Sequence, residues 1–440
     1  MIIQHNRQSL GIIDLTDLNI TKIKFYFYLP LFIILISIPT LLFSKSVDKS
    51  LRPKPYIQVS SQVNKNNVGL AFEAWILSFK ETALEKGISA TLYDKAMKNI
   101  TYNEKLIKLD RKQSEFTKQI WEYLEIAVSN QRIKNGQSAY LKNADLLNKI
   151  QNHYDVDLKI ILGIWGLESA YGFRRGSTNT IEALATLAFD GRRRKFFEEQ
   201  LIASLKILER GDTTLNKMQG SWAGAMGHTQ FIPTSYLTYA EDFNGDGLVE
   251  VWSDDPTDAL ASTANYLNQH GWIKGQPWGL EIILPNDFDY ILLGKENKNK
   301  VSYWNSLGVR QVNGNYVKDY GNSSIILPAG HRGAAFVIFS NFHVLEKYNA
   351  SLAYVMGVGH LGDRIMGGRK FHKSWPIDEN ALSSNEKKML QRYLLEDGYE
   401  IGKIDGMIGP KTISAIRVYQ RKLGKIPDGF ATKSLLKEMQ

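Results

Sequence analysis

Apolar residues recur at intervals of three and four through the first half of the chain. This spacing places them on one face of an α-helix. The segments that show it are AFEAWILSFKETALEKG, KQIWEYLEIAVSNQRI, LLNKIQNHY, VDLKIILGIWGLESAYG, TIEALATLAFD and RKFFEEQLIASLKILERG. We therefore predict a mainly helical region from Val68 to about His270.

The pattern changes between Trp272 and Ala350, where short β-prone runs are separated by Gly, Pro, Asn and Asp. These runs are LEIILP, YILLG, SSIILP and AAFVIFS. Such runs between turn residues predict a small β insertion. Helical spacing returns in YNASLAYVMGVGHLGDRIMGG, so the predicted fold class is mainly α, of the α+β type.

The N-terminus contains an uncharged apolar run, residues 25–44, preceded by Lys22 and Lys24. About 20 such residues can span a bilayer, and the basic flank predicts that everything after the run lies outside the cytoplasm. Ser44 and Ser46 fit a cleavage site, so residues 1–46 are either a removed signal peptide or a retained membrane anchor.

Polar, Pro-containing segments separate the predicted parts. Residues 47–67 are a predicted linker, residues 68–370 a predicted main domain, and residues 371–383 a second linker. Residues 384–440 then form a separate small module.

Composition limits the function classes. The chain has 440 residues, 43% of them hydrophobic and 22% charged, which is typical of a folded globular protein. A net charge of +9 favours anionic partners. No basic helix has a base-reading pattern, so we expect no nucleic acid partner. The absence of cysteine excludes disulfides, thiolate catalysis and Cys-ligated zinc.

Glu168 is a single carboxylate near the C-terminal end of an almost entirely apolar helix pattern. Burial and the negative end of the helix dipole both raise the pKa of such a group, which makes Glu168 a candidate general acid that faces a cleft. The alternative is a solvated residue on an outward face. Asp155 or Asp157 is placed to cap the start of this helix, and Gly172 to end it as the C′ residue.

The segment Gly220 to Trp252 is the second informative stretch. Its first half is dense in Gly, Ala and Ser, which lets a backbone lie close to a ligand. Ser221 and Gln230 offer hydroxyl and amide groups for sugar hydroxyls and acetamido groups. A tight loop without a ligand is the alternative.

The second half of this stretch, DFNGDGLVEVW, begins like an EF-hand calcium loop. Positions one, three, five and seven hold Asp242, Asn244, Asp246 and the Leu248 carbonyl. Ser253 occupies position twelve in place of the usual Glu, so we expect Asp258 to supply the last carboxylate while capping the next helix. A metal-free surface turn is the alternative. The calcium would be structural, and we expect no cofactor for chemistry.

GIWGLESAYG, GSWAGAMGHTQFIPTSYLTYAEDFNGDG and DALASTANYLNQHGW together resemble the membrane-bound lytic murein transglycosylase B family, which has a lysozyme-like core. The resemblance covers about Val68 to Gly368. It implies that Glu168 is the single catalytic acid/base and that Ser221 and Gln230 line the same cleft. Further residues that it implies in glycan binding are Arg192, Arg193, Tyr266, Tyr348 and Asn349, and it assigns the calcium site to Asp242, Asn244, Asp246, Leu248 and Asp258.

The tail motif DGMIGPKTISAIRVYQ is similar to the three-helix peptidoglycan-binding domain. In this motif Pro410 starts a helix, and Ile413, Ile416 and Tyr419 form an apolar stripe that we assign to the core. The resemblance implies that the partner is the peptidoglycan glycan strand, that the protein is a periplasmic monomer, and that residues 25–44 direct its export or anchor it to the inner membrane.

Most glycosidases use a pair of carboxylates, and no second one stands out here apart from the predicted calcium loop. The family resemblance implies cleavage between N-acetylmuramic acid and N-acetylglucosamine with formation of a 1,6-anhydro sugar. Two alternatives stay open: a hydrolytic muramidase and a non-catalytic wall-binding protein.

Overall fold

The computed structural model describes residues 65–113 and 118–440. The predicted N-terminal segment, with its apolar run at 25–44, lies outside the described residues. Within the described ranges, no helix is long and apolar enough to cross a membrane.

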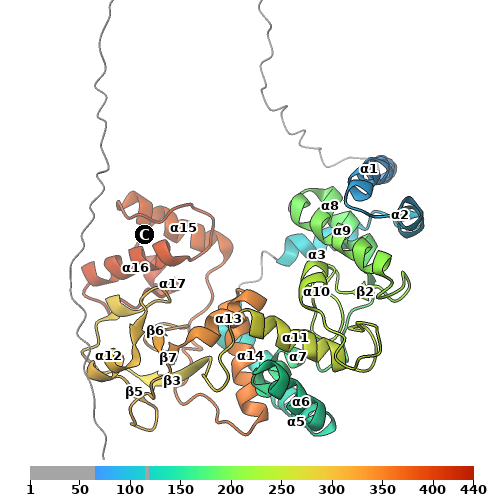
Figure 1. Cartoon of the computed structure of the whole chain (residues 1–440). Helices are drawn as coiled ribbons and strands as arrows, with labels where there is room; N and C mark the ends of the chain where they lie inside the picture. The colour runs from blue at the N-terminus through green and yellow to red at the C-terminus, as the bar shows by residue number, and fades with distance from the viewer. Residues whose placement is uncertain (1–64, 114–117) are drawn as a thin grey trace, which may run out of the picture. The chain divides into compact units, whose positions relative to one another are not determined.

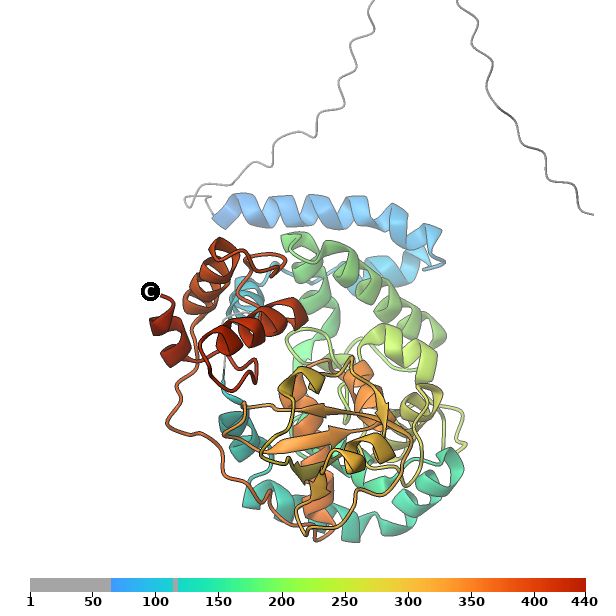
Figure 2. The same cartoon turned by 90° about the vertical axis from the view of Figure 1, so that its left-hand side faces the viewer.

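Helices build the first part of the described chain, as predicted (Figure 1). They are α1 (Lys65–Glu85), α2 (Ala90–Met97), α3 (Glu104–Gln113), α4 (Ile120–Ala127), α5 (Asn130–Lys142), α6 (Ala144–Tyr154), α7 (Leu158–Ser169), α8 (Thr180–Asp190), α9 (Arg194–Arg210), α10 (Pro233–Tyr239) and α11 (Thr257–Gln269). A two-stranded sheet joins β1 (Thr178–Asn179) to β2 (Gln219–Gly220). Helix α1 lies against α8 (Figure 2), where the rings of Phe72 and Phe189 meet edge to face at 5.4 Å.

A five-stranded antiparallel sheet follows, and it confirms the predicted β insertion. Its order is β4 (Asn299–Lys300), β6 (Asn322–Ile326), β7 (Ala335–Ile338), β3 (Gly279–Ile283) and β5 (Arg310–Gln311), with α12 (Val301–Ser306) after β4. The sheet has its own core around Trp304, which is fully buried.

The run YILLG was wrongly predicted as a strand. The structure has a 3₁₀ turn, η1 (Tyr290–Leu292), at this position. The side chain of Asp289 accepts a hydrogen bond from the Ile291 backbone N–H at 3.0 Å, and this cap starts a turn.

The chain then returns to helix, as predicted, in α13 (Ser340–Tyr348) and α14 (Leu352–Ile365). The tail forms α15 (Ser384–Glu396), α16 (Pro410–Lys422) and α17 (Lys433–Glu438) around a separate small core. Ile416 and Tyr419 of the predicted stripe are buried in it, while Ile413 is partly buried.

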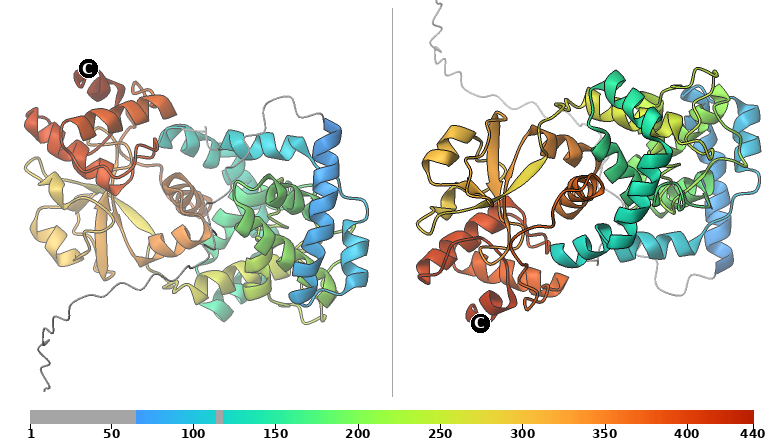
Figure 3. Two further views of the ribbon diagram at one scale, coloured as in Figure 1. Left: turned by 90° about the horizontal axis from the view of Figure 1, so that it is seen from above. Right: turned by 90° about the horizontal axis from the view of Figure 1, so that it is seen from below.

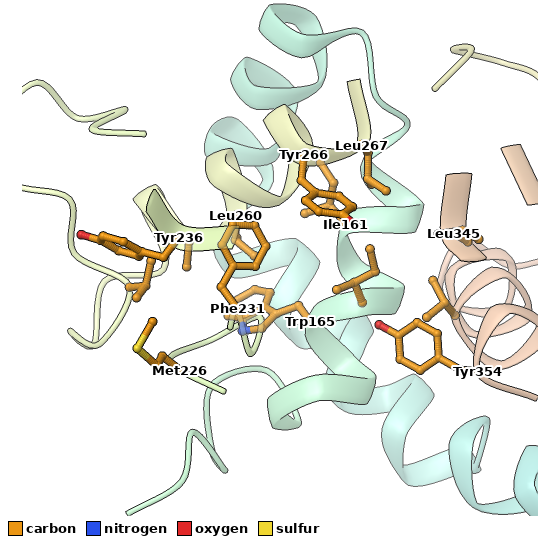
Figure 4. Close-up of a cluster of buried hydrophobic side chains, with 14 of the residues drawn as sticks. Ile161, Trp165, Met226, Phe231, Tyr236, Leu260, Tyr266, Leu267, Leu345 and Tyr354 are labelled. Carbon is orange, nitrogen blue, oxygen red and sulfur yellow. The ribbon is translucent and has the colours of Figure 1, made fainter. Parts of the chain in front are cut away.

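Helix α7 is the centre of the main core, because most of its side chains are buried on all sides. It crosses α14 at very short range: a Cβ on Gly163 would lie 2.4 Å from the Val358 carbonyl oxygen, and one on Gly362 would lie 2.3 Å from that of Lys159. Figure 4 shows Ile161 and Trp165 of α7 among side chains from α11, α13, α14 and the loop at Phe231. Two glycines therefore set the distance between α7 and α14.

Neither predicted boundary of α7 has the predicted form. Asp157 stands at the N-cap position, but its carboxylate accepts from the Trp272 indole and the Gly275 backbone N–H instead of capping the helix. The helix ends at Ser169, and its left-handed C-cap is Ala170, two residues before Gly172. Tertiary partners have replaced the expected cap at the start of α7, while its end is closed locally by the Ala170 N–H on the Trp165 carbonyl.

We predict that Gly163→Ala destabilises the protein by about 1–3 kcal/mol, because its new methyl group meets backbone that cannot move aside cheaply. Urea unfolding at constant pH would measure the change. Gly69→Ala is the matched control: Gly69 lies in α1 with open space around it, so the substitution should be neutral or stabilising. Equal stability of the two variants would contradict the role given to the α7–α14 crossing.

Candidate functional site

Glu168 lies in the last turn of α7, where its side chain is partly buried. The Tyr354 hydroxyl of α14 donates a hydrogen bond to Glu168 Oε1 at 2.6 Å. Burial raises the pKa of Glu168 to about 7, against the opposing effect of the Tyr354 hydrogen bond. Near neutral pH this carboxyl group can therefore both give and take a proton.

The charge of Glu168 acts on three tyrosines from different helices. They are Tyr123 of α4, Tyr348 of α13 and Tyr354 of α14. Burial and then the Glu168 charge raise the pKa of each, that of Tyr123 to about 12. The site therefore has neutral hydroxyl groups around a single carboxyl group.

Sequence reasoning missed Tyr123 and Tyr354. Tyr354 lies six residues after Tyr348 in a motif already singled out, so the motif itself carried a signal for it. Tyr123 gave none, because it lies on a short helix whose apolar spacing is ordinary.

The turn after α7 is held in an uncommon conformation. Ala170 and Tyr171 both have positive φ, at 50° and 62°, and Gly172 follows at 88°. The Ser169 hydroxyl donates to the His228 carbonyl at 2.5 Å and accepts from the Gly172 N–H at 2.9 Å. A Cβ on Gly172 would lie 2.5 Å from the His228 ring, so this position requires glycine.

His228 links α7 to the segment that precedes α11. Its Nδ1 lies 3.1 Å from the Trp165 indole Nε1, which can only donate, and its Nε2 lies 2.8 Å from the Ser253 carbonyl oxygen. The contacts with Trp165 and Ser253 fit a neutral imidazole with its proton on Nε2, and Arg175 Nη1, 3.2 Å from that nitrogen, donates to the same Ser253 carbonyl. Burial lowers the pKa of His228, and the Arg175 charge lowers it further. If Nδ1 of His228 were also protonated, its N–H would point at the Trp165 indole N–H, and neither group could accept.

Ser221 and Gln230 belong to the loop between β2 and α10, and both help to shape it. Ser221 Oγ accepts from the Ala225 N–H at 3.1 Å. Gln230 has φ of 55°, and its Nε2 donates to the carbonyls of Arg175 and Gly227. Among the described residues, the side-chain carbonyl oxygen of Gln230 and the hydroxyl hydrogen of Ser221 have no hydrogen-bond partner and can serve a ligand.

The three residues expected in glycan binding from the later helices have different surroundings. Tyr266, labelled in Figure 4, is 7% exposed. Its hydroxyl donates to the Lys347 carbonyl at 2.7 Å. Its ring meets that of Tyr348 edge to face at 5.1 Å. Asn349 is exposed, and its side chain accepts from the Ser351 N–H. Of the two tyrosines, only Tyr348 has its pKa raised by the Glu168 charge.

Arg192 and Arg193 stand before α9. Arg192 forms a two-bonded ion pair with the buried Asp110 of α3, which raises the pKa of the arginine. The Arg193 guanidinium lies 4.3 Å from the Phe196 ring centroid. Arg192 thus joins α3 to the start of α9, a structural role that the sequence did not indicate.

In the predicted calcium loop, side-chain oxygen atoms accept hydrogen bonds from the backbone N–H groups of the same loop. Asp242 accepts from Gly245, Asp246 and Gly247, Asn244 accepts from Asp246, and Asp246 accepts from Leu248. Asp258 is buried, and its two oxygens accept from Phe243 and Glu250. It does not cap α11, whose N-cap residue is Pro256, so that part of the prediction was wrong.

The donor set of this loop consists of oxygen atoms, which suits calcium. Over residues 65–113 and 118–440, however, no group of three or more acidic, histidine or cysteine side chains is placed to hold a metal ion. Calcium binding by this loop therefore depends on the side-chain oxygen of Asn244 and the Leu248 carbonyl oxygen as well as on the carboxylates.

Comparison with known proteins gives two family matches. Residues 71–363 match the model described as Transglycosylase SLT domain, and residues 383–439 match a peptidoglycan binding domain. A curated relative, membrane-bound lytic murein transglycosylase B of Escherichia coli (strain K12), is 35% identical over 252 residues, which cover 55% of this chain and 66% of that protein.

Two solved structures illustrate the similarity. SltB3 from Pseudomonas aeruginosa in complex with NAG-anhNAM-pentapeptide has a TM-score of 0.81 and 44% identity, and the match covers 84% of this chain and 99% of that chain. The Escherichia coli lytic transglycosylase Slt35 in complex with calcium has a TM-score of 0.57 and 27% identity, covering 68% of this chain and 93% of that chain.

We predict that Tyr354→Phe raises the pKa of Glu168 above about 7, because the lost hydrogen bond favours the ionised carboxylate. Titration of ¹³C-labelled glutamate carboxyl groups by NMR would measure it, with Glu168→Gln identifying the signal. Tyr348→Phe is the matched control: that hydroxyl donates to the Thr229 carbonyl, so the pKa should change less. A fall in the pKa in Tyr354→Phe would show that the hydrogen bond does not favour the ionised form.

Proposed function

The chain belongs to the SLT transglycosylase family, and from this premise we propose that it is a lytic transglycosylase that cleaves the β-1,4 bond between N-acetylmuramic acid and N-acetylglucosamine in peptidoglycan. The observation that carries the chemistry is the single carboxyl group of Glu168 at the end of the buried helix α7, with the Tyr354 hydroxyl 2.6 Å from its Oε1. Burial raises the pKa of this group to about 7. The charge of a second carboxylate is not among its causes.

In the first step protonated Glu168 donates its proton to the glycosidic oxygen, and the bond from C1 of the muramic acid to that oxygen breaks. The acetamido group of the same sugar stabilises the positive charge that develops at C1. Ser221 and the Gln230 carbonyl oxygen are the loop groups that can orient this acetamido group. Glu168 is now an anion, which the Tyr354 hydroxyl stabilises.

In the second step ionised Glu168 accepts the proton of the muramic acid 6-hydroxyl, whose oxygen bonds to C1. The product is a 1,6-anhydro sugar, no water is consumed, and Glu168 regains its proton. One residue acting first as acid and then as base needs a pKa near the working pH. Hydrolysis by the usual routes needs a second carboxylate near the first.

Peptidoglycan lies outside the cytoplasm, so an enzyme that acts on it works there. We propose a periplasmic monomer that residues 25–44 either export or anchor to the inner membrane, with the C-terminal helices holding the wall. We also propose a structural calcium ion held by oxygen atoms of the predicted loop: Asp242, Asn244, Asp246, Leu248 and Asp258. Its support is the loop pattern and the calcium complex of Slt35.

Mass spectrometry of digested sacculi tests the reaction. We expect anhydro-muramic ends from the unchanged protein, whereas a muramidase would leave reducing ends. Glu168→Gln should slow turnover by at least about 10³-fold, since an amide cannot donate the proton, and should still bind sacculi. Glu199→Gln, on the exposed side of α9, is the matched control. Unchanged lysis by Glu168→Gln would refute the assignment.

Calcium binding is tested by thermal unfolding after treatment with a chelator. Because an ion that binds only the folded state stabilises it, excess Ca²⁺ should raise the Tm by at least about 3 °C. Asp246→Asn should weaken this response, while Asp289→Asn, a substitution far along the chain in the β insertion, should not. Equal stabilisation by Mg²⁺, or none by Ca²⁺, would argue against the calcium site.

A further inference from the structure

A cavity of about 460 Å³ lies where the C-terminal helices meet the β6–β7 loop and the segment before α15. Its walls come from parts of the chain far apart in sequence: His331 and Arg332 from the loop, Glu379 from the segment, and Lys425, Asp428 and Ser434 from the tail. Both views of Figure 3 show the tail helices beside the sheet. The volume of the cavity is in the range found for ligand sites.

The base of the cavity is a fully bonded carboxylate. Asp428 is 7% exposed and accepts four hydrogen bonds, two from His331, through its backbone N–H and its ring, and one each from Gln420 and the Phe430 backbone. A Cβ on Gly330 would lie 2.6 Å from Asp428 Oδ2, so the two parts meet closely there. Asp428 therefore fixes the walls and has little capacity left for a ligand.

The rim offers two cations whose present partners can be exchanged. Arg332 pairs with Asp378 at 2.7 Å and with Glu379 at 3.5 Å, and the three side chains are 47%, 63% and 18% exposed. Lys425 pairs with Glu438, and these two side chains are 46% and 38% exposed. The exposed partners Asp378 and Glu438 hold these cations only weakly, because water screens such pairs, so a ligand carboxylate can displace them while Glu379 keeps its longer contact with Arg332. The Ser434 hydroxyl lies on the same wall.

We propose that this cavity binds the carboxylate-bearing peptide stem of peptidoglycan, with Arg332 and Lys425 as the groups that recognise the carboxylate. An intact glycan backbone carries no charge, so the charged side chains of the cavity gain little electrostatic energy from binding it. Sugar faces also favour aromatic platforms, and the lining has one aromatic residue, Phe430, which packs against the main core. The wall site is then shared between the C-terminal helices and the β insertion.

This inference rests on the proposed wall binding, but not on the proposed chemistry of Glu168. Two sources can supply a carboxylate: the stem peptide, and the lactyl group that is exposed when an amidase removes the peptide. The experiment separates them. It uses the full chain with Glu168→Gln, so that the wall is not digested, and measures its affinity for purified sacculi by sedimentation at fixed salt.

We expect Arg332→Ala with Lys425→Ala to weaken binding by at least about tenfold. Ser434→Trp keeps every charge but fills the cavity, and should cause a similar loss. The matched control is Arg392→Ala with Lys411→Ala, which removes the same charge from exposed positions of the tail outside the cavity. Free stem peptides should compete with sacculi, and glycan stripped of peptide should not.

Control-like binding by both cavity variants would overturn the shared site and leave the transglycosylase proposal intact. Competition by stripped glycan, without competition by free peptide, would overturn the choice of peptide. If the parent chain does not bind sacculi at all, the proposed wall binding fails and this inference with it. Circular dichroism and Tm values like those of the parent would show that each variant is folded.

Discussion

The burial of one carboxyl group, that of Glu168, is the constraint on which the rest of the site depends. A carboxyl group keeps its proton near pH 7 only if water is largely excluded from it, and α7 does this because its side chains are buried on nearly every side. Burial alone would leave a proton that is hard to remove. The Tyr354 hydroxyl moderates that effect by donating to the carboxylate, so the two contributions leave the pKa within reach of both steps of the proposed reaction.

That balance requires α14 to lie very close to α7. Gly163 and Gly362 allow the two backbones to approach, and the same approach brings Tyr354 to Glu168. The left-handed turn at Ala170 and Tyr171 is costly for residues with side chains. Ser169 and His228 hold it through hydrogen bonds that also fix the loop carrying Gln230. The glycine crossing at Gly163 and the left-handed turn at Ala170 thus lie on either side of Glu168 along the chain.

Sequence reasoning was sufficient for the long helices and for Glu168, whose signals are local, but the local run YILLG misled it because Asp289 starts a turn there. The three-and-four spacing predicted the helices, and a lone acid in an apolar helix predicted the raised pKa of Glu168. It failed where distant partners decide. Asp157 has the residue type and position of a helix cap, yet it bonds to Trp272 and Gly275, over a hundred positions further on. Tyr123 reaches the site from another helix, and no spacing within its own segment indicates that.

The position of the C-terminal helices gives a physical reason for a separate wall contact. They are fixed to the β insertion through Asp428, and Arg417 donates to the Leu293 carbonyl of the same insertion. Neither contact involves α7, α14 or the loop at His228. Binding energy gained there can hold the chain on its polymer without changing the solvation of Glu168, and solvation is what sets the pKa of that group. The proposed separate attachment point would let affinity for the wall vary while the proposed proton chemistry stays the same.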